Sequence, residues 1–268
     1  MLTAITRAPG PCLQDCELTY LQRQSIDVEK AIGQHSDYEQ CLKDLGVEVV
    51  SLRAEQDLPD AVFIEDTSVI VDEICVVARM GAARRRAEIS SVIATLSHYR
   101  PVKRIKPPAT LEGGDVIRIG RMLYVGISTR TSRDGVAQLE KLLRPYDYQV
   151  IPVQLKGCLH LTTSCSYIGQ GVILANESWV DSSHFKDFEL IDVCSLGEPW
   201  AANTVLINGV AVVSSSFPKT IELLEARGFK LKVVEISELE KAEAGLSCLS
   251  KIFETNKPAP RLRTAPFD

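Results

Sequence analysis

The segment Thr204-Val-Leu-Ile-Asn-Gly-Val-Ala-Val-Val-Ser214 predicts a β-hairpin and gives the clearest indication of the fold. Two apolar, β-branched runs flank Asn208-Gly209, a dipeptide that tight two-residue hairpin turns favour. A helix-like segment, Lys219–Ala226, follows, and Gly228 is typical of the glycine that ends a helix. Another apolar run begins at Leu231. This part of the chain therefore predicts a hairpin, a helix and a third strand.

The same order of elements recurs along the chain at intervals of roughly 40–55 residues, a period typical of repeat architectures. The predicted helices are Asp27–Leu45, Arg86–Leu96, Asp134–Leu143 and Lys219–Ala226, with a weaker one at Ser182–Phe188. The predicted hairpins are Val62–Ile64 with Ser68–Val71 and Ile74–Ala78, Asp115–Ile119 with Met122–Gly126, Cys165–Ile168 with Val172–Ala175, and Thr204–Ile207 with Val210–Ser214. The strands that follow the helices are Val47–Leu52, Val102–Ile105, Gln149–Val153, Glu189–Cys194 and Leu231–Ile236. A last strand, Ser247–Phe253, has no hairpin of its own, and we expect it to pair with Leu2–Arg7.

This repeat predicts an α/β fold. Units of such a period build propellers and other arrays, and closing them into a ring would cover the exposed sheet edges. The spacing alone leaves an open α/β sheet with irregular insertions as an alternative. We predict a single domain over residues 1–254 and a flexible tail over residues 255–268, where proline and arginine are frequent.

The composition is that of an ordinary globular chain, with 268 residues, a net charge of −5 and 45% hydrophobic residues. The negative charge argues against a nucleic-acid-binding protein. No run reaches the roughly 18–20 apolar residues of a membrane span, and Met1–Arg7 fits a strand better than a signal peptide. We therefore expect a cytoplasmic protein whose eight cysteines, which include no C-x-x-C pair, are reduced thiols. We predict no metal, no organic cofactor and no nucleic-acid or membrane partner.

Reactive side chains stand where the predicted hairpins begin. They are Asp60, Asp66, Glu112, His160, Asn203 and Cys248. In a closed ring, matching positions of the repeats would converge on one axis, where a cysteine, a histidine and a carboxylate can act as nucleophile, acid–base and orienting group. Taken singly, a cysteine in an apolar strand is usually a core residue, and two glycines after Glu112 are also typical of a turn. The shared position of these residues in the repeat favours a catalytic site.

Motifs in a fixed order surround these positions. They are Leu-Pro-Asp60-Ala-Val-Phe-Ile-Glu65-Asp66, Arg79-Met-Gly-Ala-Ala-Arg-Arg85-Arg-Ala-Glu88, Leu-Glu112-Gly-Gly-Asp115, Thr-Arg130-Thr, Leu-His160-Leu, Ala-Ala-Asn203 and Gly-Leu-Ser-Cys248. Through these motifs the chain resembles, from about Thr3 to Phe253, the dimethylarginine dimethylaminohydrolases, a family of the guanidino-group-modifying, or pentein, superfamily. The resemblance implies a five-bladed α/β propeller, in agreement with the repeat.

The resemblance implies a catalytic triad in which Cys248 is the nucleophile, His160 the general acid and base, and Glu112 the residue that orients His160. The implied reaction hydrolyses Nω-methylated L-arginine to L-citrulline and methylamine or dimethylamine through a covalent thiouronium on the cysteine. A cation bound beside Cys248 would favour the thiolate. We therefore expect the substrate to help activate the group that attacks it.

The resemblance also implies a binding site for a small guanidino amino acid. Glu65 and Asp66 match residues that hold the guanidinium, and Arg85 and Arg130 match a clamp for the α-carboxylate. Asp60 matches a residue near the α-amino group, and Leu18 and Ala242 match positions that offer it backbone carbonyls. Leu18 belongs to a loop, Leu13–Ser25, that we expect to cover the pocket.

Some positions depart from the pattern of the family. Met80 and Arg84 stand where we expect proline and serine, Ala244 where we expect glycine, and Trp200 where tyrosine is common. They bear on substrate choice, so a related guanidine hydrolase or an arginine deiminase remains an alternative. A non-catalytic binding protein on the same propeller is an alternative of another class, which the intact triad disfavours. The sequence leaves the oligomeric state, including a homodimer, open.

Overall fold

The computed structural model describes residues 1–256, and within them the strands form five three-stranded sheets. Four sheets share one plan, in which a hairpin is followed by a connection to a third strand that lies parallel to the second. They contain β3 (Ser68–Ile70), β4 (Cys75–Val77) and β5 (Val102–Arg104); β6 (Val116–Ile119), β7 (Met122–Ile127) and β8 (Gln149–Gln154); β9 (Cys165–Gly169), β10 (Val172–Ala175) and β11 (Glu189–Asp192); and β12 (Val205–Ile207), β13 (Val210–Ser214) and β14 (Lys230–Val234). The predicted repeat is confirmed.

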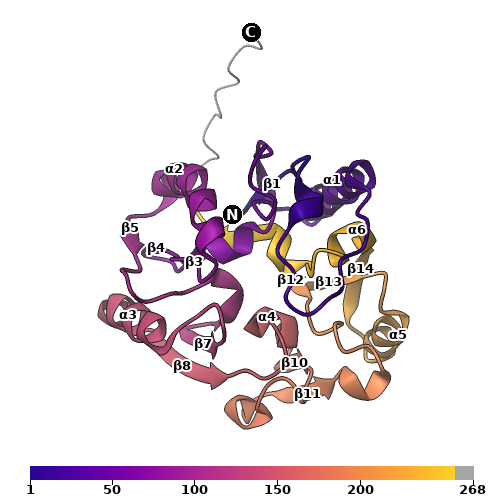
Figure 1. Ribbon diagram of the computed structural model, residues 1–268. Helices are drawn as coiled ribbons and strands as arrows, with labels where there is room; N and C mark the ends of the chain where they lie inside the picture. The colour runs from indigo at the N-terminus through magenta and orange to yellow at the C-terminus, as the bar shows by residue number, and fades with distance from the viewer. Residues whose placement is uncertain (257–268) are drawn as a thin grey trace.

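The fifth sheet joins the two ends of the described chain. Its central strand β1 (Leu2–Arg7) pairs in parallel with β2 (Glu48–Leu52) and antiparallel with β15 (Ser250–Glu254). The predicted pairing of the last strand with the first is thus confirmed, with Leu2 opposite Glu254 and Thr6 opposite Ser250. Figure 1 shows the five sheets arranged around a common centre, so the open-sheet alternative is wrong and the fold is a five-bladed α/β propeller.

The longer helices lie on the outside of the ring (Figure 1). They are α1 (Val28–Asp44), α2 (Ile89–Tyr99), α3 (Arg133–Leu143) and α5 (Pro218–Ala226), while the connection between β10 and β11 contains only a 3₁₀ turn, η6 (Ser182–Phe185). The predicted start of α1 is confirmed, because the Asp27 side chain accepts a hydrogen bond from the Lys30 N–H, as an N-cap does. Each helix buries its apolar face against a sheet, so the core is divided among the blades.

The turn predicted from Asn208-Gly209 has the expected backbone. Both residues adopt positive φ angles, 48° and 78°, which the type I′ hairpin turn requires. The amide of Asn208 also donates to the carbonyl of Leu45 at the end of α1. The turn therefore closes its own hairpin and contacts the neighbouring blade.

A short helical turn precedes the inner strand of four blades. These turns are η2 (Ile64–Thr67), η4 (Gly113–Asp115), α4 (Leu161–Ser164) and η8 (Ser247–Leu249), and each runs directly into β3, β6, β9 or β15. They crowd together closely, because a Cβ atom on Gly113 would lie only 2.1 Å from the carbonyl oxygen of Glu65. Glycine is therefore required where η4 meets η2, and the residues of these turns are brought close to one another.

Several of the predicted elements differ in the structure. The strand predicted from Ser247 begins only at Ser250, after the 3₁₀ turn η8, and the weak helix predicted at Ser182–Phe188 is the 3₁₀ turn η6. Val62–Ile64 is not a strand: Phe63 N–H donates to the Asp60 carbonyl, and the chain turns into η2. These residues are apolar because they are buried, not because they pair in a sheet. The helix predicted from Arg86 is a 3₁₀ segment, η3 (Ala83–Glu88), before α2, and the strand predicted from Glu189 ends at Asp192.

Two further predictions concern the membrane and the tail. No helix within residues 1–256 is both long enough and apolar enough to cross a bilayer. Of the predicted tail, Thr255 is buried and its N–H donates to the Met1 carbonyl. Residues 257–268 lie outside the described residues.

Candidate active site

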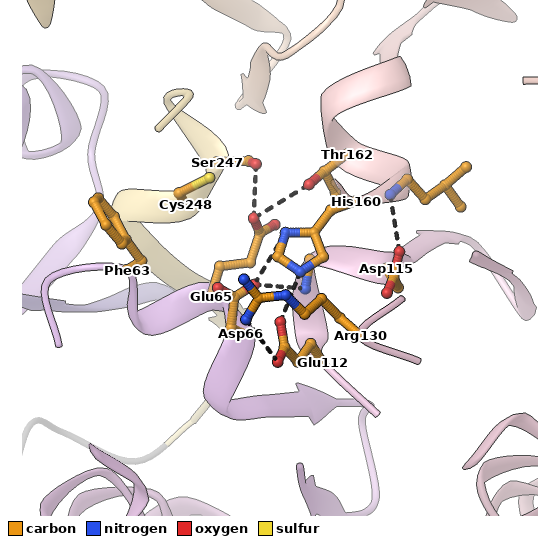
Figure 2. A network of polar contacts seen from close by, with 12 residues as sticks. Phe63, Glu65, Asp66, Glu112, Asp115, Arg130, His160, Thr162, Ser247 and Cys248 are labelled. Atoms are coloured by element: carbon orange, nitrogen blue, oxygen red, sulfur yellow. Dashed lines mark hydrogen bonds and ion pairs between the residues drawn. The ribbon is translucent and has the colours of Figure 1, made fainter. Parts of the chain in front are cut away.

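Three blades contribute Cys248, His160 and Glu112. Cys248 lies in η8, and His160 and Glu112 each immediately precede a short helical turn, α4 and η4. The Nε2 atom of His160 lies 2.8 Å from Oε2 of Glu112, and both side chains are buried. Figure 2 shows the sulfur of Cys248 and the ring of His160 on either side of the Glu65 carboxylate. The structure thus brings the predicted nucleophile, acid–base and carboxylate together.

Glu112 is held by the backbone around it. Its Oε1 accepts from the Gly81 N–H at 2.9 Å, and its own N–H donates to Thr131 Oγ1 at 3.0 Å. Burial alone would raise the pKa of Glu112, but the hydrogen bond and charge of His160 outweigh it and keep the pKa low. Glu112 is therefore an ionised carboxylate that orients the imidazole.

His160 is surrounded by acids. Its Nδ1 lies 3.7 Å from Oδ1 of Asp66, and the next backbone N–H, of Leu161, donates to Asp115 at 3.1 Å. Burial would lower the pKa of His160, but Asp66, the bond to Glu112 and the charge of Asp115 raise it to about 10. The ring is therefore an imidazolium at neutral pH and is ready to donate a proton.

Cys248, the predicted nucleophile, is buried in η8. Its sulfur receives the Gly245 N–H at 3.4 Å, and the residue is 8% exposed. Burial, together with the negative charges of Glu65 and Asp66, raises the pKa of the Cys248 thiol. In the unliganded site the sulfur is therefore a thiol, and a bound cation would shift it toward the thiolate.

The Glu65 carboxylate connects two blades. Its Oε2 accepts a hydrogen bond from Ser247 Oγ at 2.8 Å and a longer one from Thr162 Oγ1 at 3.4 Å (Figure 2). Burial raises the pKa of Glu65 to about 7, and the nearby ammonium of Lys251 opposes this rise. Glu65 therefore changes its charge close to neutral pH.

Asp66 is already paired with a cation of the chain. Its Oδ2 lies 2.8 Å from Nη1 of Arg85, and its Oδ1 accepts from the Gly114 N–H at 3.2 Å. Burial would raise the pKa of Asp66, but His160 and Arg85 outweigh it and keep the pKa low. Asp66 is therefore a permanent negative charge beside the imidazolium.

The two predicted clamp arginines lie in different surroundings. Arg85 is buried, and besides Asp66 it contacts Glu88 through Nε at 3.1 Å. Arg130 contacts Glu17 through Nη2 at 3.1 Å, while its buried Nη1 has no hydrogen-bond partner among the described residues. The structure therefore leaves a free donor on Arg130 and places Arg85 in a filled ion-pair network.

The loop predicted to cover the pocket is fastened down. The N–H groups of Thr19, Tyr20 and Leu21 all donate to Oε1 of Glu243, next to Ala242, at 2.5–2.9 Å. Figure 1 shows the indigo chain before α1 passing in front of the ring. Leu18 and Ala242 each precede a residue of this contact, and His160 is only 3% exposed.

Asp60 lies under the same loop. Its Oδ1 accepts from the Glu17 N–H at 3.0 Å, and its Oδ2 is 3.6 Å from Nη2 of Arg84. Burial raises the pKa of Asp60, whereas Arg85 and the Glu17 N–H lower it. Asp60 is thus an acid that contacts the residue before Leu18.

Asp66, Glu112 and His160 place their ligand atoms within 4.8 Å of one another, a spacing that could hold a metal ion. A metal would have to break the 2.8 Å bond between His160 and Glu112. Asp66 is in turn engaged by Arg85 and the Gly114 N–H. The arrangement is suited to proton transfer without a metal.

Several residues of the site were not singled out by the sequence. Ser247 exchanges two hydrogen bonds with Asn203, from its N–H at 2.9 Å and to its Oγ at 3.0 Å. Asn203 was among the predicted reactive positions, whereas Ser247 was noticed only as a neighbour of Cys248. Thr162 and Lys251 carry no signal, because a threonine in a turn and a lysine in a strand are ordinary residues. Both line a cavity of about 380 Å³ that reaches Glu65 from the inner strands.

A family model described as "N,N dimethylarginine dimethylhydrolase, eukaryotic" matches residues 17–193. The N(G),N(G)-dimethylarginine dimethylaminohydrolase of Pseudomonas aeruginosa is 32% identical over 251 residues, which cover 93% of this chain and 98% of that protein. The enzyme of the same name from Streptomyces coelicolor is 33% identical over 250 residues, which cover 92% of this chain and 95% of that protein.

Solved structures give the same result. A cysteine-to-serine mutant of the Pseudomonas aeruginosa protein, complexed with citrulline, matches with a TM-score of 0.89 at 30% identity over 94% of this chain and 98% of that chain. The N-terminal domain of ArgZ, a cyanobacterial arginine dihydrolase, matches with a TM-score of 0.82 at 20% identity over 94% of this chain and 98% of that chain. At that identity the second match shows a shared fold alone.

Proposed function

The chain belongs to the dimethylarginine dimethylaminohydrolase family, and we propose that Cys248, His160 and Glu112 carry out the hydrolysis for which the family is named. The protein is a cysteine-dependent hydrolase that converts Nω-methylated L-arginine to L-citrulline and methylamine or dimethylamine. The observation that carries our assignment of residues is the 2.8 Å bond between His160 and Glu112, which lie across the Glu65 carboxylate from Cys248 (Figure 2).

In the proposed complex, the substrate guanidinium lies over the carboxylates of Glu65 and Asp66. A delocalised cation is a poor electrophile, and charge-assisted hydrogen bonds to carboxylates orient it for attack. The α-amino group would be held by Asp60 and by the backbone carbonyls of Leu18 and Ala242. Arg130 would bind the α-carboxylate through its free Nη1, with Arg85 supporting it from the buried network.

The bound cation also prepares the nucleophile. Burial and the charges of Glu65 and Asp66 raise the pKa of Cys248 in the unliganded site. A guanidinium placed between these groups offsets both negative charges and favours the thiolate. Substrate binding would therefore generate the attacking species, and the thiol proton would leave the site as the thiolate forms.

In the first half of the reaction, the Cys248 thiolate forms a bond to the guanidinium carbon. His160 gives its proton to the substituted nitrogen, the carbon–nitrogen bond breaks and the amine departs. The product of this half is a thiouronium on Cys248 and a neutral imidazole. Acid catalysis of this kind accelerates a reaction by ~10²–10⁴-fold.

In the second half, neutral His160 removes a proton from water, whose oxygen attacks the same carbon. The carbon–sulfur bond then breaks, Cys248 leaves as a thiolate, the remaining hydroxyl proton passes to solvent and neutral citrulline is released. Glu112 stabilises the imidazolium that forms again. Dividing the reaction into two displacements replaces one difficult step by two easier ones.

The test is to incubate the protein with asymmetric dimethylarginine, monomethylarginine and arginine, and to measure citrulline together with dimethylamine, methylamine and ammonia. We expect citrulline in equal amount with the methylated amine, and none from Cys248→Ser. Citrulline with ammonia alone would identify a deiminase instead. No product from any of these compounds would favour the non-catalytic alternative.

The cytoplasmic location and a homodimer remain predictions. Cell fractionation tests the first, and sedimentation of the purified protein tests the second. Neither affects the proposed chemistry, because every residue assigned to it comes from one chain.

A further inference from the structure

One carboxylate, that of Glu17, lies between two arginines at the proposed α-amino-acid end of the site. Its Oε1 forms an ion pair with Nε of Arg84, and its Oε2 is 3.1 Å from Nη2 of Arg130. The two arginines differ in surroundings, because the Arg84 side chain is 52% exposed and the Arg130 side chain only 10%. Glu17 thus joins a solvent-facing cation to a buried one.

The buried cation is only half satisfied. Nη1 of Arg130 is buried without a hydrogen-bond partner among residues 1–256, and its nearest acid is Glu112, 3.9 Å away. A guanidinium binds a carboxylate best through two parallel N–H groups. Arg130 therefore has one free N–H donor, on Nη1, while its Nη2 contacts Glu17. A second carboxylate can bind both nitrogens only if Glu17 moves away.

The backbone of Glu17 places this contact at the amino-acid end of the substrate. Its N–H donates to Oδ1 of Asp60, and the next residue is Leu18. Both belong to the proposed contacts of the α-amino group. A substrate whose amino group sits there carries its α-carboxylate one carbon away, within reach of Arg130.

We propose that Glu17 is an internal competitor for the substrate's α-carboxylate at Arg130, and that Arg84 retains Glu17 when the substrate displaces it. The inference rests on the proposed function, which it deepens by naming two residues that set the affinity for free amino acids. Arg130 exchanges the carboxylate of Glu17 for that of the substrate, and Glu17 stays paired with Arg84. Binding therefore replaces one ion pair by another without leaving a buried charge uncompensated.

The consequence is a selectivity that depends on the carboxylate. A ligand with an α-carboxylate must displace Glu17 from Arg130, while a guanidine without a carboxylate leaves this contact in place. Removing the Glu17 charge should therefore raise the affinity for the first kind of ligand only. Removing Arg84 should lower that affinity, because Glu17 would then have Arg130 as its remaining arginine partner and would bind it more firmly.

The experiment compares L-arginine with agmatine, which has the same guanidinium but no carboxylate. Each ligand protects Cys248 from alkylation by 2-chloroacetamidine, and mass spectrometry gives the half-protecting concentration. For Glu17→Gln we expect this concentration to fall about three- to fivefold for L-arginine, the range of a partly exposed ion pair, and to change less than twofold for agmatine. For Arg84→Ala we expect a rise of similar size for L-arginine alone.

The double variant provides an internal check. With Glu17→Gln present, Arg84→Ala should have no further effect, because Arg84 acts through Glu17. Glu29→Gln in the first turn of α1 and Arg144→Ala, both exposed, are matched controls that should leave both ligands unchanged. Thermal unfolding confirms that each variant is folded.

Other outcomes overturn the proposal. Equal shifts for both ligands, or no shift, would show that Glu17 does not compete with the carboxylate. Weaker binding of L-arginine by Glu17→Gln would assign Glu17 to the α-ammonium instead. Protection is measured without turnover, so a failure to form citrulline would count against the proposed function and leave this comparison intact.

Discussion

The hydroxyl of Ser247 donates a 2.8 Å hydrogen bond to Oε2 of Glu65, which ties the residue beside the nucleophile to the carboxylate beneath the proposed substrate. The same hydroxyl accepts from the amide of Asn203. The turn that carries Cys248 is therefore fixed on both sides. Gly245 in this segment cannot be replaced, since a Cβ there would lie 2.2 Å from the side chain of Asn203.

Ser247→Ala should lower kcat/KM at pH 7 by about tenfold, the effect of losing one hydrogen bond to a charged group. Without this bond the pKa of Glu65 rises above about 7, so less of the carboxylate is ionised. The loss should be larger at pH 6 than at pH 8.5. Ser97→Ala, at an exposed position in α2, is the control. A loss of kcat/KM that is the same at every pH would show that Ser247 does not act through the pKa of Glu65.

Lys251→Met should move the acidic limb of the pH profile of kcat/KM to higher pH. Burial raises the pKa of Glu65 to about 7 and the Lys251 ammonium opposes the rise, so removing that charge raises the pKa further. Since kcat/KM reports groups of the free enzyme, the effect is read directly from the profile. Lys251→Arg should restore most of the activity at pH 7, and exposed Lys103→Met should have no effect. A limb that moves to lower pH would contradict the role given to Lys251.

Glu112→Gln should lower kcat by about 10²-fold or more and shift the alkaline limb to lower pH. The pKa of His160 is raised to about 10 in part by Glu112, and a neutral amide no longer stabilises the imidazolium. The profile of the unchanged protein should therefore fall near pH 10, and that of the variant should fall earlier. Glu140→Gln on α3, an exposed carboxylate, should leave the limb in place. An unchanged limb in Glu112→Gln would assign the alkaline titration to another group.

A guanidinium ligand should lower the apparent pKa of the Cys248 thiol. Burial and the charges of Glu65 and Asp66 raise this pKa in the free protein, and the ligand's positive charge compensates both acids. Thiolate absorbance, taken as the difference between the protein and Cys248→Ser, should appear at lower pH when L-arginine is present. If the pKa of the Cys248 thiol is the same with and without the ligand, the substrate does not help to form the thiolate.

Two glycine substitutions should change stability in opposite directions. Gly113→Ala forces a Cβ to within 2.1 Å of the Glu65 carbonyl and should reduce the free energy of unfolding by about 2–3 kcal/mol. Gly33→Ala, with nothing within 4 Å of the new Cβ in α1, should increase it by about 0.5–1 kcal/mol. Urea unfolding of both variants measures the difference. Equal effects would mean that η2 and η4 are not in close contact.

Local sequence signals predicted the hairpins and outer helices well. Asn208-Gly209 forces one backbone geometry on its turn, and Asp27 satisfies a free N–H at the start of α1. Both effects act within a few residues, so they can be read without the rest of the fold. Val62–Ile64 was misread because an apolar run shows burial without showing what covers it. A 3₁₀ turn packed at the centre of the ring needs the same residues as a buried strand.

The sequence predicted which residues form the site better than it predicted which of them pair with one another. The positions of Cys248, His160 and Glu112 in the repeat indicated that they would meet. In the structure His160 bonds to Glu112, and Cys248 lies across Glu65 from the imidazole (Figure 2). The different surroundings of Arg84 and Arg85 could not be read from the sequence, because adjacent residues in η3 leave the turn in different directions. Glu17 had no signal of its own, since its arginine partners lie 67 and 113 positions away.

Cys248, the proposed nucleophile, lies immediately before β15, the last strand of the described residues, which pairs with β1. A ribosome therefore exposes His160 and Glu112 well before the sulfur that they serve, and domains mature from the N-terminal side during translation. Products of premature termination lack both the seam of the ring and its reactive thiol. Incomplete copies that lack the proposed nucleophile should therefore be inert toward methylated arginine instead of partly active.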